Sequence, residues 1–119
     1  MEKESWLKLI NPDTKGVLNN NKIEGKGIYE WVDGNIYEGN WKNNKMHGYG
    51  EYQWKDGRTY KGEYANDKKQ GTGIYKWNDG RIYDGGWYNG KQHRMGNFTD
   101  PSGTTKAGEW KEGQMIRWM

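Results

Sequence analysis

The two histidines are the first residues to test for chemistry, because imidazole is the commonest metal ligand and acid–base group in proteins. His47 and His93 occupy equivalent positions, two copies apart, in a repeated block of the chain. If each copy supplies two strands to a sheet, the two side chains lie about 19 Å apart, too far to share one metal ion. We therefore expect no metal site.

Other catalytic patterns are equally hard to find in the sequence. The chain has no cysteine, which excludes disulfides and thiol chemistry. No Ser–His–Asp or paired-carboxylate arrangement stands out from the polar background. Gly-x-Gly pairs such as Gly25 and Gly27 resemble phosphate loops, but they begin expected strands and no helix N-terminus follows to receive an anion. We expect a protein that is not an enzyme and binds no cofactor.

Aromatic side chains are the best candidates for a binding function. The chain contains 8 Trp and 9 Tyr, and rigid amphipathic rings are favoured as binding hot spots. Packing of the rings on one another is the purely structural alternative. We favour packing together with partner binding, because a thin sheet can hardly hide twelve rings. The expected partner groove consists of Tyr29, Trp31, Tyr37, Trp41, Tyr52, Trp54, Tyr60, Tyr64, Tyr75, Trp77, Tyr83 and Trp87.

Lysines form a second candidate site, a basic edge in or beside the loops that join the copies. Its members are Lys42, Lys45, Lys68, Lys69 and Lys91. Solvation alone explains such lysines in most proteins. The functional alternative is attraction of an acidic segment or an anionic lipid, worth about 1 kcal/mol per Lys near a membrane surface. The formal net charge of +3 is too small to indicate nucleic acid by itself.

A block of 23 residues repeats along the chain without insertion. Copies begin at Gly25, Gly48 and Gly71, and a degenerate fourth copy begins at Arg94. Self-similarity at a fixed period is typical of arrays in which each unit buries its apolar face against its neighbours. We expect a degenerate capping hairpin over residues 1–24, three repeats over 25–93, and a degenerate fourth repeat with a C-terminal tail over 94–119.

Alternation of large and small side chains predicts two strands in each copy. A three-residue turn over Val32, Asp33 and Gly34 puts the aromatic residues of both strands on one face, with Gly34 in the left-handed conformation. A two-residue turn would split them between the faces. The link between copies must then be even, so we expect four-residue loops such as 43–46.

This register aligns similar residues across the sheet. A row of tyrosines lies beside a row of glycines from Gly27 to Gly108, and a third row places Trp41 opposite Gly48. A continuous glycine row lets every strand bend at the same height. Arg58 and Arg81, each after an Asp-Gly turn, can stack on neighbouring Trp rings. The sequence therefore predicts an all-β fold: a single-layer, elongated and grooved antiparallel sheet of stacked β-hairpins.

The two ends of the chain fit the period poorly. We expect Trp6–Ile10 and Lys15–Leu18 to form the capping hairpin. The apolar tail, residues 114–119, either adds a last strand or stays an exposed edge that pairs two chains as a homodimer. The first residues lack the apolar run of a signal peptide, and no segment approaches the roughly 20 apolar residues of a membrane span. A cytoplasmic protein is the expectation.

One segment, Tyr37-Glu-Gly-Asn-Trp-Lys-Asn-Asn-Lys-Met-His-Gly-Tyr-Gly, closely resembles the MORN repeat (membrane occupation and recognition nexus). The family pattern is roughly Tyr-x-Gly-x-Trp followed by Gly-Lys-x-His-Gly-x-Gly, and the same frame recurs from Tyr60 and Tyr83. Gln70 in place of His and Arg94 in place of Gly depart from it. The resemblance covers about residues 16–113 and implies antiparallel hairpins stacked into a grooved sheet.

The resemblance also implies a non-catalytic interaction module. Some MORN arrays hold a helical or extended segment of a partner, in cytoskeletal or ciliary scaffolds among others, and an older idea for the family is binding of acidic phospholipids. We therefore expect a protein–protein adaptor, with an anionic membrane surface as the first alternative. Carbohydrate or single-stranded nucleic acid stacked on the aromatic wall is a second alternative, and the low net charge argues against nucleic acid.

Overall fold

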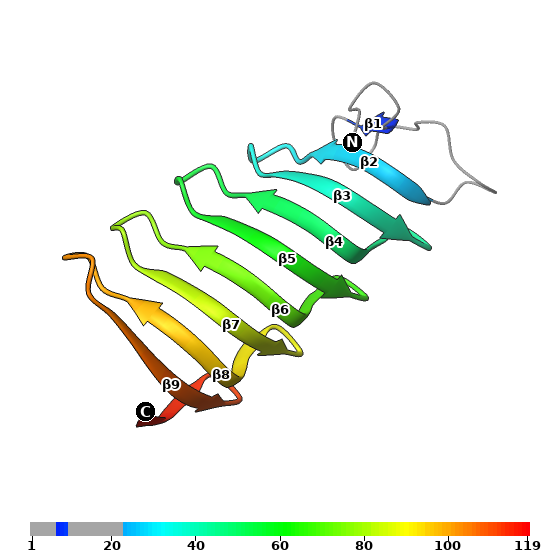
Figure 1. Ribbon diagram of the computed structural model, residues 1–119. Helices are drawn as coiled ribbons and strands as arrows, with labels where there is room; N and C mark the ends of the chain where they lie inside the picture. Colours follow the sequence, from blue (N-terminus) through cyan, green and yellow to red (C-terminus); the bar gives the residue numbers. More distant parts are fainter. Residues whose placement is uncertain (1–6, 10–22) are drawn as a thin grey trace.

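The computed structural model describes residues 7–9 and 23–119, and the strands among them form one sheet (Figure 1). The strands lie in the sheet in their order along the chain, and each strand from β3 to β10 is antiparallel to the strand before it. They are β1 (Leu7–Leu9), β2 (Gly25–Glu30), β3 (Ile36–Lys42), β4 (Lys45–Gln53), β5 (Thr59–Ala65), β6 (Lys68–Lys76), β7 (Ile82–Tyr88), β8 (Lys91–Thr99), β9 (Thr105–Lys111) and β10 (Gln114–Trp118). The described residues contain no helix. The predicted all-β sheet of stacked hairpins is confirmed.

The turns at one edge of the sheet are the predicted three-residue turns. The Trp31 amide donates to the Asn35 carbonyl over 2.9 Å, and the Gly34 amide donates to the Trp31 carbonyl over 2.9 Å. Gly34 has a φ of 99°, in the left-handed region that favours glycine. Tyr29 therefore lies directly opposite Tyr37, and the aromatic residues of both strands share a face.

The loops at the other edge differ from the prediction. β3 and β4 are joined by a two-residue turn of Asn43 and Asn44, whose φ angles of 51° and 69° are those of a type I′ turn. The expected four-residue loops are therefore wrong. The remaining residues form a bulge in β4 opposite the segment from Gly39 to Trp41. The turn residues and the extra residues of the bulge add up to an even number. The aromatic residues therefore stay on the predicted face.

Each bulge also changes one predicted row of residues. Met46, in place of Gly48, lies opposite Trp41, and Lys69 lies opposite Tyr64. The expected alternation of large residues with glycine is thus interrupted between repeats. The bulges thus bring Met46 and Lys69 onto the aromatic face, among its rings and glycines.

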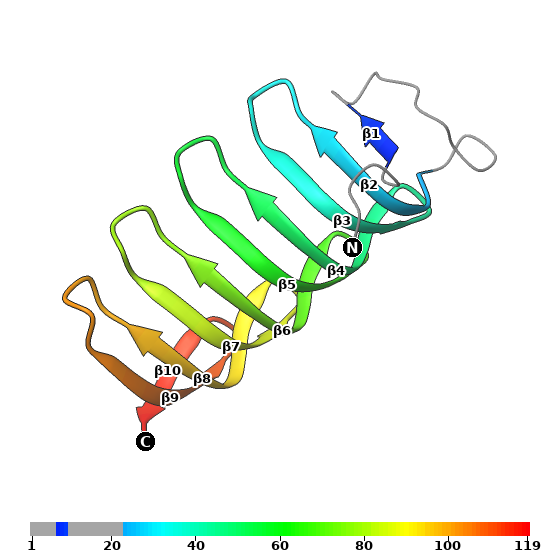
Figure 2. The same cartoon turned by 45° about the horizontal axis from the view of Figure 1, so that its top comes forward.

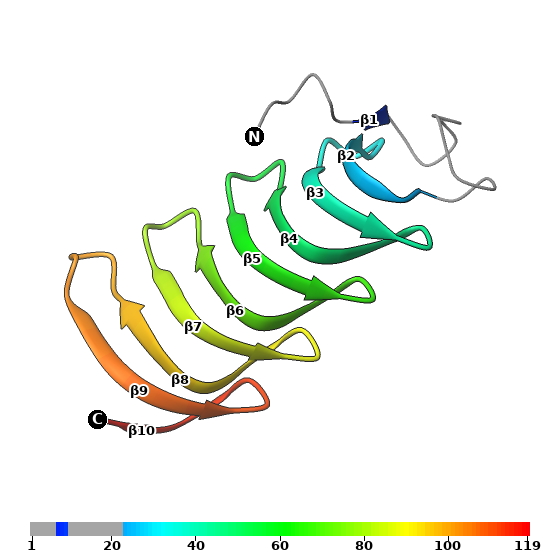
Figure 3. The same cartoon turned by 45° about the vertical axis from the view of Figure 1, so that its right-hand side comes forward.

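The glycine row is confirmed from Gly27 to Gly108. A methyl group at Gly50 would collide with the ring of Tyr37, which lies across that backbone. The strands bend at this row. Tyr37 and Trp41 would be about 13 Å apart along a flat strand, yet their ring centroids are 5.1 Å apart. Figures 2 and 3 show the resulting curvature, repeated in every hairpin, which makes the sheet a trough.

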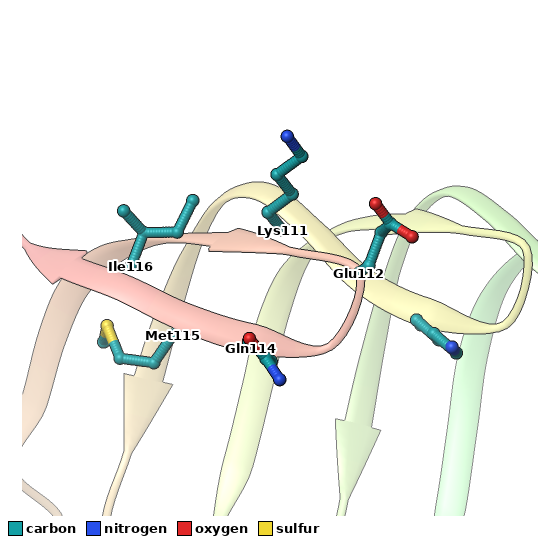
Figure 4. Close-up of a pocket in the computed structure, with 6 residues that line it drawn as sticks. Lys111, Glu112, Gln114, Met115 and Ile116 are labelled. Atoms are coloured by element: carbon teal, nitrogen blue, oxygen red, sulfur yellow. The ribbon is translucent and has the colours of Figure 1, made fainter.

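The two ends of the sheet differ from the middle. β1 pairs with β2 in parallel, and the second strand of the expected capping hairpin, Lys15–Leu18, lies outside the described residues. At the other end the tail forms β10, with a register shift between Met115 and Arg117. Figure 4 shows Met115 and Ile116 pointing to opposite sides of this strand. The tail therefore adds the last strand, and a homodimer through it stays a prediction.

Candidate functional site

The aromatic face has a deep row of rings in edge-to-face contact, which we call the core chain. Tyr37, for example, meets Trp41 at 86° and Tyr64 at 88°, with centroids 5.1 and 5.4 Å apart. Its successive members, each in contact with the next, are Trp41, Tyr37, Tyr64, Tyr60, Trp87, Tyr83 and Trp110. This geometry is a preferred one for aromatic pairs, worth roughly 0.5–1.5 kcal/mol each beyond area burial. The core chain makes up most of the hydrophobic core of the sheet, which also includes Tyr29, Met46 and Tyr75.

Hydrogen bonds fix the core chain to the backbone. The hydroxyl groups of Tyr37, Tyr60 and Tyr83 donate to carbonyls three residues further on, over 3.0, 2.9 and 2.9 Å. The indole of Trp87 donates to the carbonyl of Gly73 over 3.1 Å. Burial raises the pKa of each of these three tyrosines, that of Tyr83 to about 12. These phenols are therefore held neutral as structural donors.

A second row of rings, the rim chain, runs along the same face above the core chain. Its members, each in contact with the next, are Tyr29, Trp31, Tyr52, Trp54, Tyr75, Trp77, Phe98 and Trp118. Centroid distances between neighbours run from 4.4 Å at Tyr52 and Trp54 to 6.4 Å at Phe98 and Trp118. The rim chain is thus a continuous aromatic strip along the trough.

The structure divides the twelve expected groove residues into two groups. Eight are buried: Tyr29, Tyr37, Trp41, Tyr60, Tyr64, Tyr75, Tyr83 and Trp87. The other four, Trp31, Tyr52, Trp54 and Trp77, are half-buried members of the rim chain. A bent single layer therefore hides more rings than expected, because strands fold their own rings together, as β3 does with Tyr37 and Trp41 and β5 with Tyr60 and Tyr64. Of these twelve rings, the four half-buried ones are those that offer surface to a partner.

Two arginines stack on rim rings as predicted. Arg58 lies over Trp54 and Arg81 over Trp77, each with its guanidinium carbon 4.9 Å from the ring centroid. Each guanidinium also pairs with the aspartate of its own turn through Nε at 2.8 Å. These contacts hold both cations flat against the aromatic face.

Lys69 differs from the other lysines of the expected basic edge, because its ammonium lies on the aromatic face. Its Nζ is 5.4 to 5.5 Å from the centroids of four rings, which are Trp54, Tyr60, Tyr75 and Trp87. Burial lowers the pKa of Lys69, and the charge of Arg58 lowers it further. The remaining four, Lys42, Lys45, Lys68 and Lys91, are exposed at the tips of the loops. The structure thus separates Lys69 from a basic edge of four residues.

The histidines bind the loops of neighbouring repeats together. Nδ1 of His47 accepts a hydrogen bond from the Asn66 amide over 3.3 Å, and Nδ1 of His93 accepts one from the Glu112 amide over 3.3 Å. Oε1 of Gln70 accepts the equivalent bond from the Asn89 amide over 3.2 Å. These hydrogen bonds give both histidines a role in loop packing.

Among the hollows in the described part of the chain, two lie along the C-terminal half of the trough, beside a smaller one of about 120 Å³ lined by Phe98, Asp100, Thr104, Lys106 and Trp118. One, of about 320 Å³, includes Lys69, Trp77 and Gln92 in its lining. The other, of about 260 Å³, is open to solvent between Trp77 and Trp118. Sequence reasoning did not include Phe98, Trp110 or Trp118 in the groove, although the period aligns Phe98 with the tyrosine row. These hollows mark the part of the face with room for a ligand.

Residues typical of catalysis do not gather in the described part of the chain. No group of three or more His, Cys, Asp or Glu side chains there could hold a metal ion. The same residues contain no helix able to cross a membrane.

A family model of the MORN repeat matches residues 15–36, 37–57, 60–80, 83–105 and 107–115. The chain therefore belongs to the MORN-repeat family. Proteins with this repeat are generally non-catalytic modules involved in protein or membrane interactions. A search of curated proteins found no match to this chain.

Proposed function

We propose that this protein is a non-catalytic adaptor whose rim chain holds an apolar segment of another protein. The carrying observation is the rim chain, in which Trp31, Tyr52, Trp54 and Trp77 stay half-exposed above the buried core chain while Tyr29 and Tyr75 are buried. Aromatic anchors of this kind dominate the energy of many interfaces. The proposed setting is a cytoplasmic assembly of the cytoskeletal or ciliary type, which rests on the family resemblance alone.

The shape of the face supports a peptide segment as the bound group. The trough is already bent by its backbone, and rings such as Tyr52 and Trp54 are fixed by contacts with their neighbours. A partner that binds such a rigid surface loses little of the protein's own conformational entropy. Modest apolar contacts can therefore give useful affinity.

The experiment is capture of partners on the immobilised protein, followed by mass spectrometry. The variants Trp54→Ala and Trp77→Ala each remove one half-exposed ring of the trough. Matched controls are Tyr49→Ala and Tyr88→Ala, because these tyrosines are 53% and 54% exposed and lie on the opposite face. Circular dichroism of every variant checks that the sheet is intact.

The proposal predicts that both Trp variants lose at least tenfold of the captured partner while both Tyr controls retain it. Equal capture by all four variants would contradict it. Equal loss in all four, with an intact sheet, would move the binding surface away from the aromatic face.

Binding to an anionic membrane surface is the second candidate. It is favoured by the four lysines exposed at successive loop tips along one edge, which are Lys42, Lys45, Lys68 and Lys91. Sedimentation with phosphatidylserine vesicles tests it at low and high salt, since such attraction is screened within about 10 Å at 0.1 M salt. This candidate predicts salt-sensitive binding that the double variant Lys68→Glu, Lys91→Glu abolishes and Trp54→Ala leaves unchanged.

A further inference from the structure

The hollow of about 260 Å³ near the C-terminal end of the trough combines an apolar wall with one cation. Trp77, Phe98 and Trp118 supply rings, and Met115 lies beside them. Arg81 is the charged residue in its lining. Among the described residues no aspartate or glutamate lines this hollow, whereas Asp100 lines a smaller adjoining hollow that shares Phe98 and Trp118 with it. A ligand there meets apolar surface and positive charge together.

Arg81 differs from its equivalent, Arg58, in one partner. A terminal nitrogen of Arg58 donates to the hydroxyl of Tyr75 over 3.0 Å. The position of Tyr75 is taken one repeat later by Phe98, which has no hydroxyl. Within the described part of the chain, the terminal nitrogens of Arg81 donate to no protein acceptor, and its Nε is bonded to Asp79. Donors of a guanidinium held against Trp77 are therefore free at the hollow.

The surrounding charge selects the sign of the ligand. The Nζ of Lys106 lies 5.7 Å from the ring centroid of Trp118, so a second cation lies beside this wall, in the adjoining hollow that Asp100 also lines. One repeat earlier, the ammonium group of Lys69 occupies the equivalent position between the rings, Trp54 and Trp87 among them. Here neutral Gln92 replaces that lysine, and Arg81 already supplies a cation to Trp77. An added cation would be repelled, whereas a carboxylate would gain charge-assisted hydrogen bonds.

We propose that this hollow takes a large apolar side chain of a partner segment, and that a neighbouring acidic side chain pairs with Arg81. This inference rests on the proposed function and gives the partner its chemistry: an apolar anchor flanked by Asp or Glu. The cavity is large enough for an indole or phenyl group, and the guanidinium at its border fixes the direction of the bound carboxylate.

Three small probes with the same ring separate the contributions. They are 3-(indol-3-yl)propionate, its uncharged primary amide, and the cation tryptamine. Binding to the full chain is followed by the indole N–H signals in ¹H–¹⁵N spectra. We expect the propionate to bind at least threefold more tightly than the amide, tryptamine to bind most weakly, and the signals of Trp77 and Trp118 to shift while that of Trp41 does not.

Two variants test the role of Arg81 itself. Arg81→Gln removes the cation, and Phe98→Tyr keeps every charge but gives Arg81 the hydroxyl partner that Arg58 has. Both are expected to bring the ratio of the two dissociation constants close to one. The matched control Arg58→Gln should leave the ratio unchanged.

Tightest binding by tryptamine, a ratio near one in the wild type, a ratio that survives Arg81→Gln, or no shift with any probe would overturn the inference. Partner capture that requires Trp77 but ignores Arg81→Gln would leave the adaptor function standing and remove only this site chemistry. Partner capture that is unchanged in both Trp77→Ala and Arg81→Gln would end both proposals.

Discussion

The ring of Tyr60 lies directly over the backbone of Gly73 on the neighbouring strand, with no room for a β-carbon between them. Tyr60 is fully buried, and its hydroxyl is held by the Glu63 carbonyl, so the ring has nowhere to move. The same relationship joins Tyr37 to Gly50 and lets each strand fold its aromatic residues together. The trough depends on this repeated contact.

Gly73→Ala should therefore be strongly destabilising. The added methyl group collides with the Tyr60 ring, and overpacking of this kind costs about 3 kcal/mol in free energy of unfolding. Urea unfolding followed by Trp fluorescence measures the loss. Gly90→Asn is the control, because a β-carbon at Gly90 meets nothing within 4 Å and Asn44 holds the same turn position. The free energy of unfolding of Gly90→Asn should differ from that of the wild type by no more than about 0.5 kcal/mol.

Arg94→Gly should stabilise the protein. Arg94 has a φ of 67°, whereas the equivalent Gly48 and Gly71 have 89° and 88°. A side chain in this left-handed conformation costs roughly 1–2 kcal/mol, so glycine should raise the free energy of unfolding by about 1 kcal/mol. Arg94→Ala removes the same side chain but keeps the β-carbon and should give no such gain. Equal stabilisation by both variants would show that the guanidinium, and not the backbone, is the source of strain.

His47→Gln should be nearly neutral, because Gln70 accepts the same loop hydrogen bond in the next repeat. His47→Ala leaves the Asn66 amide without that acceptor and should lower the free energy of unfolding by about 1 kcal/mol. Thermal melts of the two variants, compared with wild type, measure the difference. A stability loss as large in the Gln variant as in the Ala variant would argue against the hydrogen bond as the role of this residue.

The protein should unfold at alkaline pH. Burial raises the pKa of Tyr37, Tyr60, Tyr64 and Tyr83 above the ordinary value of 10.0. A raised folded-state pKa contributes stability that is complete below pH 10 and is lost as the unfolded chain begins to ionise. At pH 11, each of these tyrosines should lower the free energy of unfolding by about 1.4 kcal/mol. The lowered pKa of Lys69 has the opposite sign, but it is one group against four.

Thermal melts between pH 8 and pH 11.5, with phenolate absorbance at 295 nm, test this expectation. The melting temperature should fall steeply above pH 10, and phenolate from the buried rings should appear together with unfolding. A melting temperature that stays constant to pH 11 would contradict the assigned burial of the tyrosines.

Local sequence patterns were sufficient to predict the face of each strand. The Asp33-Gly34 turn carries its own signal, since glycine is favoured at the left-handed position, and the strict period then transfers the register to every copy. The loops at the other edge were mispredicted because Asn43 and Asn44 form a type I′ turn whose extra residues move into a bulge. Both arrangements contain an even number of residues between the strands, so the alternation of faces along the chain does not distinguish a four-residue loop from a short turn with a bulge.

The sequence did not predict how deeply the rings are buried or that Lys69 lies on the aromatic face. Both depend on the bend at the glycine row, which brings the ring of Trp41 onto that of Tyr37 within one strand. The bulge in β6 then turns Lys69 inward, whereas Lys68 beside it stays at the exposed tip. Periodicity shows which residues share a face, but three-dimensional curvature decides which of them remain accessible.

Site-specific photo-crosslinking tests the central claim, that the partner lies in the trough, most directly. p-Benzoylphenylalanine is placed at Trp54, on the rim chain, or at Tyr49, exposed on the opposite face, and each protein is irradiated with the captured partner. The account predicts a crosslinked partner from position 54 and none from position 49. Crosslinking from position 49 alone would contradict it.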